Sequence, residues 1–308
     1  MLRDLTMPAT PAWVPHDVVT LAVPAFIVLI VLEMLVVRVT KRGGYETKDS
    51  AASLFMGFGS TIAGVLTGGL YLASALWIYQ HRLFDIGWAW WALALCFFAE
   101  DFTYYVFHRV SHERRIWWAA HVVHHSSQHY NLSTALRQTW TGAIALSFIT
   151  KLPLFWIGFP PAMVFFFSGV SLVYQFWIHT EAIGRMGPFE WIFNTPSHHR
   201  VHHATNPRYL DANYAGVLII WDKIFNTFTP EVDADPPRYG IIANLGTFNP
   251  LRIALHEWIG IARDLRYSTS PREWIGYVFG PPGWSPDGSR ATSESLKAAW
   301  RASATPAE

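Results

Sequence analysis

Four long runs of apolar residues constrain the fold of this chain more than any other feature of its sequence. Residues 18–37 are apolar apart from Thr20 and Glu33, and residues 51–79 carry no charged side chain. A helix needs about 20 apolar residues to cross the hydrocarbon core of a bilayer. Both runs reach that length, so each predicts a transmembrane helix.

The other two runs can be embedded in a membrane only under a further condition. Residues 86–107 contain Glu100 and Asp101. This run therefore predicts a third span only if both carboxylates face protein or water rather than lipid. Residues 139–178 hold a single charge and are too long for one span, and a Gly-Phe-Pro-Pro segment at 158–161 interrupts them. We expect a helical hairpin that turns at the prolines, with both arms spanning or forming a re-entrant pair.

The composition favours a membrane protein over a soluble enzyme. Only 15% of the 308 residues are charged, against about 25% in an average soluble domain. The net charge of +1 gives no basic surface for nucleic acid. The single cysteine, Cys96, excludes a disulfide framework and a thiolate metal site. The segment before residue 18 lacks the pattern of a cleaved leader, so we expect the first apolar run to be retained.

The distribution of lysine and arginine predicts how the spans are oriented. These residues gather after the first run, after the third run and beyond the hairpin, and are nearly absent after the second run and from the hairpin turn. Positive residues accumulate in cytoplasmic loops. We therefore expect residues 38–50, 108–138 and 179–308 in the cytoplasm and the N-terminus outside. The expected fold is all-α, an integral membrane helical bundle with a cytoplasmic helical cap.

We divide the chain into three parts. Residues 1–50 hold the N-terminal segment and the first transmembrane helix, residues 51–285 form the main membrane-embedded domain, and residues 286–308 form a flexible tail. A charged, amphipathic stretch lies around residues 251–265. The tail after Arg290 is rich in serine and alanine, which predicts a disordered or weakly helical segment.

Histidines are concentrated in two short windows of the sequence. Ten of the 14 lie within residues 108–129 and 198–203, where an even distribution would place about one. Most are three or four positions apart, a spacing that puts side chains on one face of a helix. They form three boxes: His108 and His112; His121, His124 and His125; and His199, His202 and His203. We expect each box to direct its imidazoles to a common point, just past the cytoplasmic end of an apolar run.

Three such boxes predict a metal centre. Crowded imidazoles repel one another when protonated, and a bound cation keeps them neutral. Eight imidazoles exceed the needs of one metal ion, so we expect two. Imidazole suits zinc, copper, iron and nickel, and spacing alone leaves the metal open.

The boxes resemble the three histidine boxes of the membrane fatty acid hydroxylase and sterol desaturase superfamily. The resemblance covers roughly residues 45–285, and within the superfamily it points to the branch that contains alkylglycerol monooxygenase. It is carried by the boxes and by the strings at 100–109, 130–138, 174–181, 194–203 and 214–225.

The resemblance implies a non-haem di-iron oxidoreductase that uses O2 to hydroxylate a membrane lipid with an acyl, alkyl-ether or sterol-like chain. The chain has no flavin, NAD or haem-attachment motif. We therefore expect a separate electron donor, such as a ferredoxin-type protein or a tetrahydropterin. The sequence favours no particular oligomeric state.

The resemblance assigns the eight box histidines as iron ligands. We expect His179, at the cytoplasmic end of the hairpin, to be a ninth ligand, with a capping or core role as its alternative. His129, four residues after His125, and His198, beside the third box, are the other two candidates for that place.

Three further residues are expected to act at the centre. Glu113 directly follows a ligand and would bridge the metal ions or accept an imidazole N–H, although it could equally be a solvated helix charge. Asp101 lies seven residues before His108, on the same helix face, and would orient it. Asn131 is a weaker candidate for the layer around the ligands, and so is Asp211.

Rival functions stay open from sequence alone. A lipid desaturase of the same superfamily shares the boxes and differs in where the substrate C–H bonds sit. A membrane metal-binding or transport protein would place its ligands near the middle of the membrane, whereas these boxes flank the spans. A structural scaffold with a relic metal site would consume no oxygen.

Overall fold

The computed structural model describes residues 8–15, 17–41 and 43–304. Within these ranges the regular structure is helical, and the β-structure amounts to two isolated bridges, Phe193 with Leu218 and Ala204 with Tyr239. The expected all-α class is confirmed.

The first two apolar runs form long helices, α1 (Val18–Thr40) and α2 (Thr47–Tyr79). In the described part of the chain, these are the helices long and apolar enough to cross a membrane, and only 11% and 6% of their most apolar windows are buried. Glu33 of α1 is an exception, because it is buried and accepts hydrogen bonds from the backbone N–H of Leu132 and the hydroxyls of Tyr45 and Thr180.

The third run forms α3 (Trp90–Glu113), and both of its carboxylates face protein. Glu100 is buried and accepts hydrogen bonds from Lys151 Nζ at 2.5 Å and Ser168 Oγ at 2.8 Å. Asp101 is also buried and accepts from the backbone of residues 217–218. Both carboxylates thus face protein, as a third span requires, but α3 is not among the helices apolar enough to cross a membrane, and its spanning stays a prediction.

The fourth run turns at the expected place but does not form two long arms. Helix α6 (Pro161–Trp177) follows a turn in which Gly158 has φ +124°, and a Cβ there would lie 2.0 Å from the Phe84 carbonyl oxygen. The arm before the turn consists of turns, the short 3-10 helix η2 (Ile149–Lys151) and the six-residue helix α5 (Leu152–Ile157). A helix of six residues extends only about 9 Å. The first arm is therefore too short to span a bilayer as a helix, and the re-entrant alternative stays a prediction.

The missing arm has a physical cause. Trp140 donates its indole N–H to the Met56 carbonyl oxygen at 2.9 Å, and the Thr141 hydroxyl accepts from Trp258 at 2.9 Å. Leu146 adopts φ +50°, outside the helical region. These contacts hold residues 139–148 against two other helices as a folded loop.

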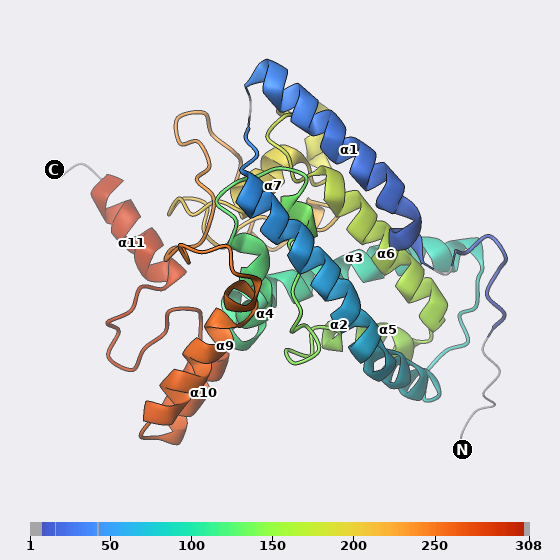
Figure 1. The fold of residues 1–308 in the computed structure, drawn as a ribbon. Coiled ribbons are helices and arrows are strands. Elements are labelled where there is room, and N and C mark those ends of the chain that lie inside the picture. The colour runs from blue at the N-terminus through green and yellow to red at the C-terminus, as the bar shows by residue number, and fades with distance from the viewer. Residues whose placement is uncertain (1–7, 16, 42, 305–308) are drawn as a thin grey trace.

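The remaining helices contain 3 to 18 residues each. They are α4 (Arg115–His125), η1 (Thr134–Leu136), η3 (Gly187–Trp191), α7 (Pro196–His202), α8 (Ile220–Ile224), α9 (Pro250–Tyr267), α10 (Pro271–Phe279) and α11 (Ser293–Ala304). Helix α11 occupies the segment after Arg290, and residues 305–308 lie outside the described ranges. Figure 1 shows α1, α2 and α6 running side by side. Helices α9, α10 and α11 lie on the other side of α4 from this group (Figure 1).

One apolar core fills the space among α2, α3, α5 and α6. Its buried members include Ala75, Cys96, Phe155 and Met163. This packing fixes the direction of α3, whose last turn carries the first histidine box.

Candidate metal centre

Nine buried or half-buried histidines meet where the ends of α3 and α6 approach α4 and α7. They divide into two clusters, and within each cluster the ligand nitrogens all lie within 4.8 Å of one another. Cluster A contains His108, His112, His121, His125 and His202, and cluster B contains His124, His179, His199 and His203. The structure thus brings together the nine histidines expected as ligands.

The second and third boxes each contribute to both clusters. His124 and His125 are neighbours on α4, yet they belong to different clusters, and so do His202 and His203 at the end of α7. Successive residues on a helix point about 100° apart, so adjacent histidines face different neighbours. The expectation that each box converges on one point is wrong for these two boxes.

Backbone carbonyl groups hold four of the imidazole rings. The Nδ1 atoms lie 2.7 to 3.3 Å from carbonyl oxygens, which can only accept. Each of these Nδ1 atoms therefore carries the ring proton and leaves the Nε2 lone pair free, as a metal-binding histidine requires. The pairs are His108 with Tyr214, His202 with Ala212, His124 with Arg137 and His179 with Gln175.

The positions of the unprotonated Nε2 atoms are suitable for binding metal ions. His124 Nε2 and His179 Nε2 are 3.1 Å apart. Because both rings donate through Nδ1, two lone pairs face each other with no proton between them, and a cation relieves that repulsion. His112 Nε2 and His202 Nε2 are buried without a hydrogen-bond partner. Two imidazole nitrogens bound to one metal ion at right angles, each at about 2.1 Å, would lie about 3 Å apart.

Burial keeps five of the clustered histidines neutral at physiological pH, because it lowers their pKa values. Burial lowers the pKa values of His121, His125, His199 and His202 well below their usual range, and the neighbouring imidazoles lower them further. Burial likewise lowers the pKa of His124 to about 4. The neutral form is the one that binds metal ions.

The hydrogen bonds of Asp101 go to the segment 217–221 and not to His108, so its role in orienting His108 stays a prediction. Its carboxylate accepts from the backbone N–H groups of Val217 and Leu218, at 2.9 and 3.1 Å, and from the Trp221 indole at 2.9 Å. The 217–221 segment packs against this face of α3, and its N–H groups satisfy the carboxylate oxygens.

Asp222 is a supporting residue that sequence reasoning missed. It is buried and accepts hydrogen bonds from the backbone N–H groups of Tyr214 and Ala215, both at 2.8 Å, and from the Thr227 hydroxyl at 2.6 Å. Burial raises its pKa to about 6. It therefore fixes the peptide whose carbonyl oxygen holds His108. Asp222 lies within residues 214–225, one of the segments that resemble the family, and this was the sequence signal that could have identified it.

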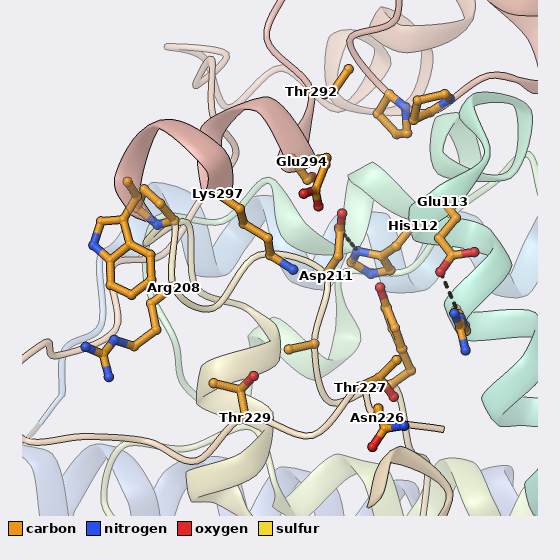
Figure 2. A pocket seen from close by; sticks show the side chains of 18 of the residues that line it. His112, Glu113, Arg208, Asp211, Asn226, Thr227, Thr229, Thr292, Glu294 and Lys297 are labelled. Atoms are coloured by element: carbon orange, nitrogen blue, oxygen red, sulfur yellow. Dashed lines mark hydrogen bonds and ion pairs between the residues drawn. The ribbon is translucent and has the colours of Figure 1, made fainter. Parts of the chain in front are cut away.

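Glu113 lies beside the clusters and belongs to neither. Its carboxylate accepts from Arg109 Nε at 2.8 Å, at the edge of a polar pocket of about 450 Å³. Figure 2 shows Asp211 pointing toward the imidazole of His112 in the same pocket, with Lys297 reaching in from α11. Asp211 Oδ1 is 3.7 Å from His112 Nδ1. In this pocket Asp211 is the carboxylate that faces a cluster histidine.

The other candidates lie outside the clusters. Asn131 donates to the Gly44 carbonyl oxygen at 2.8 Å and accepts from Ser133, so it secures a loop, and its role around the ligands stays a prediction. His129 and His198 belong to neither cluster. His198 Nε2 instead approaches a carboxylate oxygen of Glu190 at 3.9 Å.

An apolar cavity of about 350 Å³ opens onto the centre. Four cluster histidines lie in its wall: His112, His125, His202 and His203. Much of the rest is apolar and comes from Trp118, Val122, Leu210, Ile241 and Ile242. Its volume is within the range of cavities that bind small molecules.

Comparisons with known proteins identify the family to which this chain is similar. Residues 93–227 match the fatty acid hydroxylase family. The chain is 39% identical to an alkylglycerol monooxygenase of Xenopus tropicalis over 275 residues and 40% identical to that of Homo sapiens over 277 residues, each match covering 88% of this chain. It is 28% identical over 205 residues to an ornithine lipid hydroxylase of Rhizobium tropici, a match that covers 64% of this chain and 60% of that protein.

The chain spans about 60% of the length of the alkylglycerol monooxygenases that it matches. No solved structure matches it. The histidine boxes at 108–125 fall inside the matched family region, and so does the box at 199–203. The chain therefore belongs to the fatty acid hydroxylase family and is a homologue of the alkylglycerol monooxygenases.

Proposed function

We propose that this protein is a membrane lipid monooxygenase whose clusters A and B each hold one iron ion. The observation that carries the proposal is the apolar cavity whose wall contains histidines of both clusters. An apolar chain in this cavity would lie against the metal-binding nitrogens. The names of the relatives, alkylglycerol monooxygenase and ornithine lipid hydroxylase, support the same class of reaction.

When bound, iron supplies the capacity to activate O2 for insertion of one oxygen atom into a C–H bond. The reaction consumes two electrons and two protons, and it yields a hydroxylated lipid and water. The chain's own residues prepare the site: four backbone carbonyl groups hold imidazole rings with Nε2 free, and burial keeps the rings neutral. Glu113 is proposed to act at the rim of the centre, although its present partner is Arg109.

A separate donor would supply the electrons. The polar pocket whose wall includes His112 and Asp211 would give a water-soluble reductant access to cluster A. Its cationic and anionic groups, among them Lys297 of α11, suit a polar partner better than a hydrocarbon.

We propose that α1 and α2 span the membrane, with α3 and α6 packed beside them and the clusters on the cytoplasmic side. The exposed apolar surface of α1 and α2 supports this, because residues such as Leu21, Ile27, Val65 and Leu66 are more than half exposed. The distribution of lysine and arginine supports the orientation, with the N-terminus outside. The domain division at residues 50 and 285 belongs to the same proposal.

The substrate proposed is a lipid with a long acyl or alkyl-ether chain. The relatives named for alkylglycerols favour the ether lipid. Hydroxylation of the carbon next to an ether oxygen gives a hemiacetal, which breaks down to an aldehyde and an alcohol. Hydroxylation elsewhere leaves a stable alcohol.

Comparative lipidomics tests the proposed function. Cells that produce the protein under isotopically labelled oxygen gas should gain a lipid that carries one labelled oxygen atom, or the aldehyde released from an ether lipid. Cells that produce His199→Ala should not. Loss of two hydrogens without added oxygen would instead identify a desaturase. An unchanged lipidome accompanied by metal uptake into vesicles would identify a transporter and overturn the proposal.

A further inference from the structure

Helices α9 and α10 form a hairpin whose exposed charges are all positive. Arg252, Arg263, Arg266 and Arg272 are exposed, and none forms an ion pair in the described structure. Two of the three acidic residues of the hairpin pair with arginines outside it: Glu257 with Arg115, and Asp264 with Arg115 and Arg290. The third, Glu273, accepts hydrogen bonds from the backbone N–H and hydroxyl of Thr269. Four exposed arginines against this one carboxylate give the outer surface of the hairpin a net positive charge.

The same hairpin exposes a stripe of large apolar side chains. Leu251, Leu255 and Ile259 are four residues apart, share one face of α9 and are 62%, 39% and 53% exposed. On α10, Trp274 and Ile275 are 54% and 63% exposed. A helix with an apolar stripe beside arginines is typical of elements that lie in the interface of a bilayer.

The position of the hairpin agrees with that reading. Ile253 and Ala254 of α9 are buried against Ala52 and Met56, which lie in the first turns of α2. Figure 1 shows α9 and α10 running across the direction of α2 and not alongside it. If α2 crosses the bilayer, the hairpin lies roughly along the membrane plane at the end of α2 where the histidine clusters are.

We propose that the α9–α10 hairpin lies on the bilayer surface and binds anionic lipids. Leu251, Leu255, Ile259 and Ile275 would enter the boundary between headgroups and acyl chains, while the arginine guanidinium groups extend to the lipid phosphates. This proposal rests on the proposed spanning helices α1 and α2, and it is independent of the oxidation chemistry.

The hairpin also connects the membrane surface to the apolar cavity. His256 and Glu257 of α9 lie in the cavity wall. Arg115, at the start of α4, donates to Glu257 Oε1 at 2.6 Å, and α4 carries three of the clustered histidines. Binding of the hairpin to lipid would therefore place the cavity close to the phase that contains the substrate.

The test uses the full chain in liposomes with an environment-sensitive fluorophore on Ile275→Cys. The native Cys96 is buried and should not be labelled. In vesicles that contain phosphatidylglycerol, the emission should shift to shorter wavelength and be quenched by lipids spin-labelled in the acyl chain. Both effects should be weaker in pure phosphatidylcholine. Changing the four hairpin arginines to glutamine should abolish the difference between the two lipids.

Two controls keep the outcomes distinct. A fluorophore on Ala234→Cys, an exposed position outside the hairpin, should show no shift, and Arg238→Gln should leave the lipid dependence unchanged. If the chain resists alkaline extraction but the emission of the label at position 275 is the same in both kinds of vesicle, the hairpin proposal is wrong. The proposal that α1 and α2 span the membrane is then unaffected. If the chain is extracted, the spanning proposal fails. A shift that appears in detergent with rising protein concentration would point to a second copy and overturn lipid binding.

Discussion

At the scale of single residues, adjacent side chains with the same chemistry have different environments. His198 and His199 are both buried, yet only His199 joins a histidine cluster. His124 and His125 are both clustered but face different partners. The function of each imidazole thus depends on its direction from the helix axis and not on its residue type.

The pair His198 and His199 provides a matched test of cluster B. His199→Ala removes one nitrogen from the cluster, so we expect the purified protein to lose about half of its bound metal. His198→Ala removes an equally buried imidazole from outside the cluster and should leave the metal content unchanged. Elemental analysis of both variants measures this. Equal losses in the two variants would contradict the assignment.

A substitution of Asp222 tests whether the hydrogen bonds around the clusters stabilise the metal centre. Asp222→Asn replaces one acceptor oxygen by an amide that faces backbone N–H groups, and this should cost about 1–3 kcal/mol of unfolding free energy. It should also weaken metal binding, because the Tyr214 carbonyl oxygen that holds His108 would shift. Thermal unfolding and metal titration in detergent measure the two effects. Asp233→Asn, on a side chain that is 91% exposed, is the control and should behave like the original protein.

At the scale of elements, buried ion pairs join the helices that carry the clusters to the C-terminal part of the chain. Arg115 begins α4 and is almost fully buried, with Glu257 Oε1 and Asp264 Oδ2 each 2.6 Å away on α9. Arg290 donates to the same Asp264. This network sets the position of α4, and therefore of His121, His124 and His125, relative to α9.

Substitutions of the adjacent residues Arg114 and Arg115 distinguish the effect of the ion-pair network from the effect of removing any positive charge. Arg115→Gln should lower the unfolding free energy by about 3 kcal/mol, because it leaves buried carboxylates with fewer partners. Arg114→Gln alters an exposed side chain that donates to the Phe279 carbonyl oxygen, and it should change stability by less than about 0.5 kcal/mol. Thermal midpoints in detergent compare the two. Similar midpoints would show that the buried network does not stabilise the cap.

At the scale of the whole molecule, the metal centre lies where segments distant in sequence converge. Cluster B combines residues from α4, from the end of α6 and from α7. Without a cation, the free nitrogens of His124 and His179 face each other at 3.1 Å. The bound metal is therefore expected to hold these segments together.

Metal removal tests this expectation on the full chain. A ligand that binds only the folded state stabilises it by about 2.7 kcal/mol when present at 100 times its dissociation constant. Chelation should therefore lower the thermal midpoint, and ferrous iron should restore it. Calcium, which prefers oxygen ligands, should not. A midpoint unaffected by chelation, in protein verified to be metal-free, would show that the clusters do not depend on metal for their structure.

Local periodicity made much of the molecule predictable from sequence. The long helices α1 and α2 follow from apolar length, and all nine clustered histidines follow from helical spacing together with the family resemblance. Local sequence patterns did not predict the conformation of segments that are held by contacts with residues distant in the sequence. Residues 139–148 are apolar enough for a helix, but hydrogen bonds to α2 and α9 hold them as a loop.

The sequence by itself determined which residues are apolar, which are histidines and which of them share a helix face. Only the tertiary structure decided how the boxes divide into two clusters, which carboxylates support them and where a cavity opens. The reason is that these features depend on residues far apart in the chain: His108 is held by a carbonyl group 106 residues away, and Asp101 accepts from a peptide 116 residues away. Helical spacing repeats every few residues and contains no information about such distant partners.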